Sequence, residues 1–199
     1  MNFFLLDTLA DHGRGDLCFT DKLPNGIGSS TYRLAEGDSL REAFSGDVPE
    51  IQWQLGDDFP GLKLASFIGN TGRFFAVHQD AANVIQQHRI GEAEVVPFTL
   101  YNHRGRVHSR DYVFVNPLGS VDCLNTAASV IRRANSGRVL SISKVVLDAD
   151  KPLDQRDLFR IREKPRGYVL SERLVTALAA NQFTNFTINP LEQLRGGIE

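Results

Sequence analysis

The pattern that decides the fold lies in residues 75–97, which read FAVHQDAANVIQQHRIGEAEVVP, and it returns in residues 168–190, which read YVLSERLVTALAANQFTNFTINP. Each stretch opens with an apolar triplet, typical of a buried strand, and continues with apolar residues spaced i, i+3, i+4, typical of a helix. A further apolar stretch predicts a second strand. Of eleven apolar positions in the first stretch, ten are apolar in the second, and only Val96, matched by Asn189, breaks the pattern. Either an old duplication or convergent patterning would produce this agreement.

Further strands are predicted around these two units. Short runs rich in aromatic and β-branched residues occupy residues 3–6, 112–115, 139–147 and 158–161. Ile51, Trp53 and Leu55 alternate, which predicts a short strand with these three side chains on its buried face. Pro97 interrupts the strand expected near residues 93–101, so we expect an edge or a bulge there.

These elements predict an α+β fold in a single domain covering residues 1–199, with a mixed, mostly antiparallel sheet and a few helices. Residues 1–70 should be its less regular, acidic part. The two related strand–helix–strand units should lie at residues 74–101 and 158–190.

Composition indicates an ordinary globular protein, because 42 % of its 199 residues are hydrophobic and 23 % are charged. Cys18 and Cys123 stand far apart and do not suggest a secreted disulfide framework. The start, Met1-Asn-Phe-Phe-Leu-Leu-Asp7, lacks the basic segment of a signal peptide, and no stretch approaches the roughly 20 apolar residues that span a bilayer. We therefore expect a cytoplasmic protein without a membrane segment.

Charge is distributed unevenly along the chain. Residues 1–100 hold 7 Lys/Arg against 14 Asp/Glu, whereas residues 101–199 hold 15 against 10. The acids are densest between positions 36 and 58: Glu36, Asp38, Glu42, Asp47, Glu50, Asp57 and Asp58. Such a run is either a solvated surface or a patch that meets a basic partner.

The sequence contains no known catalytic or cofactor-binding motif. The five histidines, His12, His78, His88, His103 and His108, are scattered, and neither cysteine has the spacing of a zinc site. His78 and Ser171 stand at equivalent helix starts, where each side chain would cap the helix. No phosphate loop, dinucleotide loop or nucleophile elbow occurs. We therefore expect no metal, no cofactor and no enzymatic activity.

Two alternatives stay open. Cys123 activated by His103 or His108, or a carboxylate site such as Asp57-Asp58, would make the protein a small hydrolase or transferase. Arg104, Arg106, His108 and Arg110 alternate, and a strand would place them on one face near two tyrosines, as in a weak nucleic-acid-binding module. The sequence pI of about 6.2 argues against nucleic acid as a partner.

A set of short motifs, taken in order, resembles a known family. They are Phe4-Leu-Leu-Asp7, Ser30-Thr-Tyr-Arg-Leu34, Leu64-Ala-Ser-Phe-Ile-Gly-Asn70, Pro97-Phe-Thr-Leu-Tyr101, Arg110-Asp-Tyr-Val-Phe-Val-Asn-Pro-Leu118, Val121-Asp-Cys-Leu124, Lys144-Val-Val-Leu-Asp148, Leu158-Phe-Arg-Ile161 and Tyr168-Val-Leu-Ser-Glu-Arg-Leu174. Together they resemble the bacterial polymorphic-toxin immunity family numbered eleven, over essentially the whole chain.

The resemblance implies an intracellular protein, encoded beside a toxin, that binds the cognate protein toxin and blocks it. It supplies no catalytic residue and no toxin chemistry. For the toxin-binding surface we expect the acids Glu42, Asp47, Glu50, Asp57 and Asp58 around Trp53, because an acidic cluster with one large aromatic matches a cationic toxin. Arg104, Arg106 and Arg110 form the alternative, basic surface.

Overall fold

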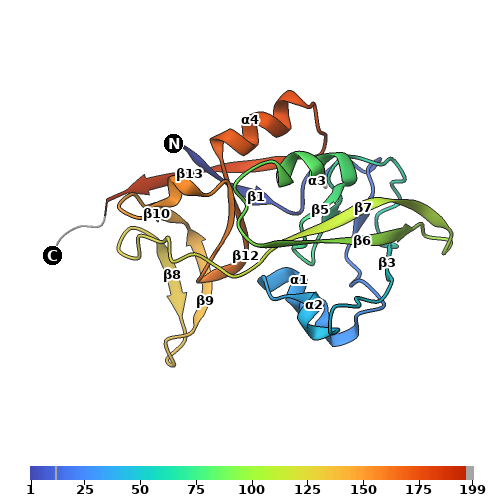
Figure 1. The fold of residues 1–199 in the computed structure, drawn as a ribbon, viewed down its shortest axis with the longest axis horizontal. Coiled ribbons are helices and arrows are strands. Elements are labelled where there is room, and N and C mark those ends of the chain that lie inside the picture. The colour runs from blue at the N-terminus through green and yellow to red at the C-terminus, as the bar shows by residue number, and fades with distance from the viewer. Residues whose placement is uncertain (12, 196–199) are drawn as a thin grey trace.

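The computed structural model describes residues 1–11 and 13–195, and these form an α+β fold built on two larger sheets (Figure 1). The five-stranded sheet has the order β10 (Val146–Asp148), β13 (Thr187–Leu194), β1 (Phe3–Asp7), β12 (Lys164–Ser171) and β11 (Leu158–Ile161). The four-stranded sheet has the order β3 (Ile51–Gln54), β6 (Ala93–Tyr101), β7 (Val107–Pro117) and β5 (Ala76–His78). Their pairing is mixed and mostly antiparallel, as predicted.

Helices and smaller strand pairs surround these sheets. The α-helices are α1 (Thr31–Glu36), α2 (Leu40–Ala43), α3 (Gln79–Gln86) and α4 (Glu172–Ala180), and 3-10 turns occupy η1 (Gly28–Ser30) and η2 (Leu153–Gln155). The short parallel pair is β2 (Phe19–Thr20) with β4 (Gly69–Asn70), and the antiparallel hairpin is β8 (Val130–Arg133) with β9 (Val139–Lys144). The single strand predicted over residues 139–147 is wrong in its extent: β9 ends at Lys144, and β10 joins the five-stranded sheet from Val146.

Both predicted strand–helix–strand units are present, as β5–α3–β6 and β12–α4–β13. In each unit the two strands are separated by one antiparallel strand, which is β7 in the first unit and β1 in the second. The two outer strands of each unit therefore run parallel to each other, as in a split β-α-β unit. The two sequence repeats thus share their topology as well as their apolar pattern.

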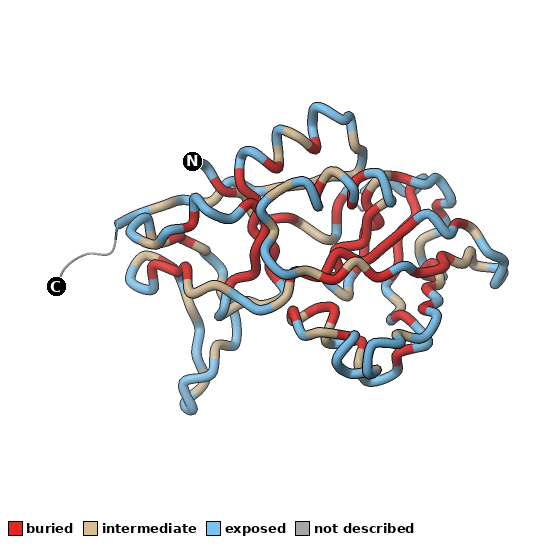
Figure 2. Tube along the Cα trace, in the orientation of Figure 1, coloured by how far each residue is buried: buried red, intermediate tan, exposed pale blue. Residues whose placement is uncertain are grey.

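The apolar run in β7 is continuous because both faces of its sheet are buried. Tyr112 and Phe114 enter a core cluster with helices α1 and α2, whereas Val113 and Val115 enter a second cluster with α3 and α4. Successive strand residues point to opposite faces, so this run covers both clusters. The second cluster also contains Leu158, Tyr168 and Leu170 of the five-stranded sheet, so both sheets contribute to it. Figure 2 shows the buried backbone gathered there, while the β8–β9 hairpin extends outward and is largely exposed.

Pro97 lies inside β6 at a place that the sheet tolerates. β3 pairs with β6 only from Phe98 to Tyr101, so Pro97 stands on a stretch of β6 that β3 does not reach. The register of β6 against β7 shifts just after it, between Phe98 and Leu100. This agrees with the expected edge or bulge, because a proline nitrogen donates no hydrogen bond to a neighbouring strand.

Candidate functional site

Trp53 does not belong to an exposed surface, and its predicted role as an anchor on the toxin-binding face is wrong. Its side chain is fully buried, its Nε1–H donates to the Lys22 carbonyl oxygen at 2.8 Å, and its ring meets Phe74 and Phe98 edge-on. Alternation along β3 turns Ile51 and Trp53 toward the core cluster beneath α1 and α2. The alternation correctly predicted a buried strand face. Because of this burial, the Trp53 indole cannot contact another protein on the surface.

The five predicted acids are exposed, but they lie at the two ends of β3. Glu42 lies on α2, and Asp47 and Glu50 lie between α2 and the start of β3. Asp57 and Asp58 follow the other end of the strand. Four extended residues cover about 13 Å, so the two groups are separated along the surface. We call Glu42, Asp47 and Glu50 the α2 acidic group.

The acids differ in their electrostatic surroundings. Asp57 forms an ion pair with Lys22 at 2.9 Å, and it shares a cavity of about 560 Å³ with Arg104 and Arg106. Nearby cations partly neutralise that end of β3. Within residues 1–11 and 13–195, neither Glu42 nor Asp47 has an ion-pair partner. Glu50 shares a cavity with Arg110, so Glu42 and Asp47 are the acids of the α2 acidic group that have neither an ion pair nor a cavity shared with a cation among the described residues.

A buried carboxylate holds α2 against the sheet. Glu94 of β6 accepts hydrogen bonds from the backbone N–H of Leu40 at 2.9 Å and of Arg41 at 3.1 Å, and from the Ser39 hydroxyl. Burial raises the pKa of Glu94, but these hydrogen bonds together with one from Asn116 outweigh it, so the pKa lies below its ordinary value. Because Ser39 also caps α2, the helix that carries Glu42 is fixed at its N-terminus.

A buried guanidinium holds the end of α1. The Arg160 side chain is 1 % exposed and donates to the carbonyl oxygens of Leu34, Ala35, Pro117 and Pro165, at 2.6–2.9 Å. Its remaining partners are side-chain oxygens of β7 and β12, and its guanidinium lies 4.3 Å from the centre of the Tyr168 ring. A cation at the C-terminal carbonyls of a helix is favourable. The residue therefore joins α1 to both sheets.

The arginines of the alternative surface are not brought onto one strand face, and that prediction is wrong. Arg104 lies in the turn before β7, and Arg106 lies just before the strand begins. The register shifts between the Leu100–Ser109 and Phe98–Tyr112 pairs, and Arg110 lies within that irregularity. Arg110 instead lines a cavity of about 260 Å³ with Glu50. A bulge breaks the alternation that the sequence pattern assumed.

His103 and His108 have structural contacts on this hairpin. The Nε2 atom of His103 is 2.8 Å from the Phe59 carbonyl oxygen, and that of His108 is 2.8 Å from the Leu62 carbonyl oxygen. Both rings thus fasten the β6–β7 hairpin to the 57–62 loop. Neither imidazole is hydrogen-bonded to Cys123, which packs in the core cluster that contains Phe159 and Val169.

Both cysteines are buried free thiols. Burial raises the pKa of Cys18 and that of Cys123 to about 12. A thiol with such a pKa is almost entirely protonated at neutral pH and is a poor nucleophile. Both thiols are therefore small, buried side chains of the core.

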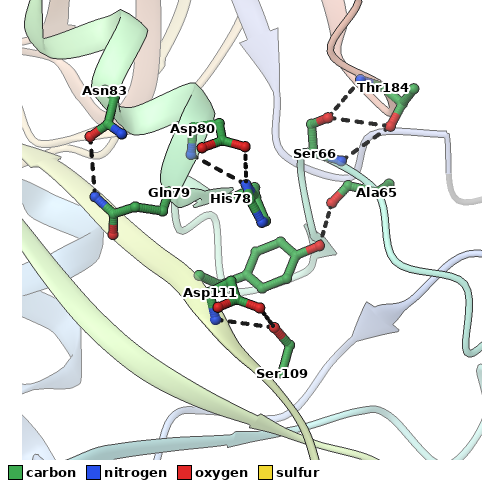
Figure 3. A network of polar contacts seen from close by, with 10 residues as sticks. Ala65, Ser66, His78, Gln79, Asp80, Asn83, Ser109, Asp111 and Thr184 are labelled. Carbon is green, nitrogen blue, oxygen red and sulfur yellow. Dashed lines mark hydrogen bonds and ion pairs between the residues drawn. The ribbon is translucent and has the colours of Figure 1, made fainter.

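The other described histidines also have local partners, whereas His12 lies outside the described residues. His78 accepts a hydrogen bond at Nδ1 from the backbone N–H of Asp80 and caps α3, as predicted, and Figure 3 shows this contact beside the Ser66–Thr184 contacts. Ser171 caps α4 in the same way. Over the described part of the chain, no serine, threonine or cysteine is hydrogen-bonded to an imidazole, and no cluster of three or more His, Cys, Asp or Glu could hold a metal ion.

Three buried charged residues, Glu94, Asp157 and Arg160, were missed by the sequence reading. Asp157 accepts hydrogen bonds from the Ser171 hydroxyl, from Arg173 Nε at 2.9 Å and from the backbone N–H of Arg89 at 3.1 Å. One signal was visible in the sequence: Arg160 is the single charged residue in the apolar strand 158–161. A cation at such a position is buried and needs partners.

Comparison with known proteins identifies the chain. A family model described as the Immunity protein family (Imm11) matches residues 65–193, which include the β5–α3–β6 unit and all of the β12–α4–β13 unit except Leu194. The class is thus that of immunity proteins, as the motifs predicted. The chain belongs to the Imm11 immunity protein family. The match does not extend to the first two motifs of the resemblance, Phe4–Asp7 and Ser30–Leu34. No curated protein matches the sequence, and no helix among the described residues is long and apolar enough to cross a membrane.

Proposed function

We propose that this protein neutralises one cognate bacterial toxin by binding it in the cytoplasm, without chemistry of its own. Membership of the Imm11 family carries this proposal, because an immunity protein has a toxin as its partner. Blocking a toxin requires a stable interface, which typically takes about 800 Å² from each protein. Neither a cofactor nor a nucleic acid is needed for this mode of action.

We propose the α2 acidic group as the centre of the toxin-binding surface. Glu42, Asp47 and Glu50 are exposed, and Glu94 and Arg160 fix the α1–α2 segment behind them. A preorganised surface loses less conformational freedom on binding. Asp57 and Asp58 would contribute less, because cations lie close to them.

Protection of a host that expresses the toxin tests this proposal. The double variant Glu42→Lys, Asp47→Lys should lose protection, because like charges repel a cationic toxin. The matched control is the double variant Asp57→Lys, Asp58→Lys, which changes the net charge by the same amount. This control should keep most of the protection. Full protection by the first variant, expressed at the wild-type level, would show that the toxin binds elsewhere.

The enzymatic alternative has a separate test. Cys123→Ala, His103→Ala and His108→Ala should each leave protection intact if the protein acts by binding alone. Loss of protection in a folded Cys123→Ala protein would favour the hydrolase or transferase. The nucleic-acid alternative predicts binding that weakens steeply with salt, and we expect no such binding.

A further inference from the structure

A cavity of about 320 Å³ lies where β12 separates from β1. β13 pairs with β1 as far as Asp7, whereas β12 pairs with it only from Phe3 to Leu5. Beyond Leu5 the two strands diverge, and the space between them is lined by Asp7, Thr8, Arg73, Lys164 and Arg166, among others. Three cations and one acid thus surround one opening.

Two of these cations lack an anionic partner. Arg166 forms an ion pair with Glu36 at 2.8 Å, but among residues 1–11 and 13–195 neither Arg73 nor Lys164 has a carboxylate within ion-pair distance. Asp7 accepts a hydrogen bond from the backbone N–H of Leu9 instead. Burial, and then the charge of Arg73, lower the pKa of Lys164. Among the described residues, the exposed Arg73 and the half-buried Lys164 thus face one cavity without an ion pair, with Asp7 as the acid in its lining.

The backbone places Arg73 there at a conformational cost. Arg73 has φ of 61°, a left-handed conformation that is unfavourable for a residue with a Cβ. Asn70 shapes this turn, because its side chain donates to the carbonyl oxygens of Ile68 and Phe74 and accepts from the Phe74 N–H. Tyr168 also donates its hydroxyl to the Arg73 carbonyl oxygen at 3.1 Å. Strain maintained in this way is often found at binding sites.

We propose that this cavity binds a phosphoryl group, either as free phosphate or pyrophosphate or as part of a nucleotide. A phosphoryl group presents at least three acceptor oxygens and can engage Arg73 and Lys164 at once, beside the Asp7 carboxylate that already lines the cavity. An arginine fork matches two oxygens of a phosphate, and a lysine acts as a point charge beside it. The volume is within the range of small-ligand sites. This site is separate from the proposed toxin-binding surface, and its occupation does not require the toxin.

Calorimetric titration of the full chain with phosphate, pyrophosphate and acetate tests the proposal. Pyrophosphate should bind saturably, and Lys164→Met and Arg73→Gln should each weaken it at least tenfold, as expected for loss of a charge-assisted partner. Lys63→Met is the matched control, because Lys63 is 63 % exposed and lies outside the cavity lining. Equal weakening in the control, acetate binding as tight as phosphate, or no saturable binding would each overturn the proposal.

Thermal unfolding without ligand gives a second readout. Lys164→Met keeps most of the length of the side chain and removes a half-buried charge that has no ion pair, so its melting temperature should rise by about 2–4 °C. A lower melting temperature would show that Lys164 is structural and would contradict the proposal. An adjoining groove shares Thr71 and Arg166 with the cavity and is lined by Tyr32. If the ligand is a nucleotide, AMP should bind more tightly than phosphate, and Tyr32→Ala should remove the difference.

Discussion

At the scale of single residues, buried charges fix the elements that carry the proposed binding surface. The guanidinium of Arg160 donates to backbone carbonyls of α1, β7 and the start of β12, so three segments distant in sequence share one side chain. Asp157 likewise joins distant segments, because it accepts hydrogen bonds from the backbone N–H of Arg89, after α3, and from the hydroxyl of Ser171, at the start of α4. A buried charge is tolerated when hydrogen bonds satisfy it. A substitution that changes the donors or acceptors at such a site leaves some of the partners unsatisfied.

Arg160→Lys should lower the free energy of unfolding by about 3–5 kcal/mol, as when a buried charge loses its partners. An ammonium has three donors and cannot reproduce the planar fork of a guanidinium. Urea unfolding followed by circular dichroism measures the change. Arg162→Lys is the control, because that side chain is 60 % exposed, and it should alter stability by less than about 0.5 kcal/mol. Similar values for both variants would contradict the role of Arg160.

The Asp157 carboxylate predicts how stability depends on pH. Burial raises its pKa, but the hydrogen bonds from Ser171, Arg89 and Arg173 hold the pKa below the ordinary 3.8. The carboxylate therefore stabilises the folded protein above about pH 4, and this contribution is lost as the pH falls through the lowered pKa.

Asp157→Asn should thus destabilise the protein by about 2–4 kcal/mol at pH 7, with the difference from wild type shrinking below pH 4. Urea unfolding across this pH range measures it, with the exposed Asp58→Asn as the control. A difference that is independent of pH would show that the loss is one of shape rather than charge.

At the scale of elements, the two helix starts provide a matched pair. His78 and Ser171 occupy the same position in the two units, and each accepts a hydrogen bond from the first turn of its helix. Ser171 is fully buried and also donates to Asp157, whereas the His78 side chain is 34 % exposed and contacts the exposed Asp80.

Ser171→Ala should therefore cost about 2–3 kcal/mol, and His78→Ala about 1 kcal/mol or less. Chemical denaturation of the two variants gives both values. Equal losses would mean that the link to Asp157 contributes nothing beyond the cap itself.

The elements that the sequence predicted best are those with local signals. The apolar spacing at residues 79–86 and 172–180 places the apolar side chains on one face of a helix, so it predicted both helices. The capping residues just before them were predicted as well. The insertion of β7 and β1 into the two units depends on pairing between distant segments, which no local pattern reports. The bulge near Arg110 likewise depends on how β6 pairs with β7.

The candidate surface was predicted less well, for a physical reason. The sequence allowed two interpretations of Trp53, as a buried strand residue and as an interface anchor. Alternation shows which residues share one face of a strand, but it does not show whether that face packs in the core or meets a partner. The acids were correctly expected to be exposed. Their division into two groups depends on the length of β3 and on Lys22, which lies 35 positions before Asp57.

At the scale of the whole molecule, we propose that the chain folds as one domain. The core cluster around α3 and α4 contains residues of both larger sheets, such as Val113 of β7 and Leu170 of β12. Arg160 adds a polar link between β7 and the five-stranded sheet. Neither sheet can therefore unfold without exposing apolar surface of the other.

Thermal unfolding should accordingly show one cooperative transition, with equal calorimetric and van't Hoff enthalpies. Differential scanning calorimetry with intrinsic tryptophan fluorescence measures it, since Trp53 packs in a core cluster that contains no residue of the five-stranded sheet. Two separated transitions, or a fluorescence change well before the main heat absorption, would show independent units.

The affinity of the purified protein for its cognate toxin domain tests the central claim most directly. At low ionic strength, Glu42→Lys with Asp47→Lys should weaken binding at least tenfold, mainly through slower association, and added salt should reduce the difference. Asp57→Lys with Asp58→Lys should weaken it much less. Wild-type affinity in the first double variant, or an equal loss in both, would contradict a binding surface centred on the α2 acidic group.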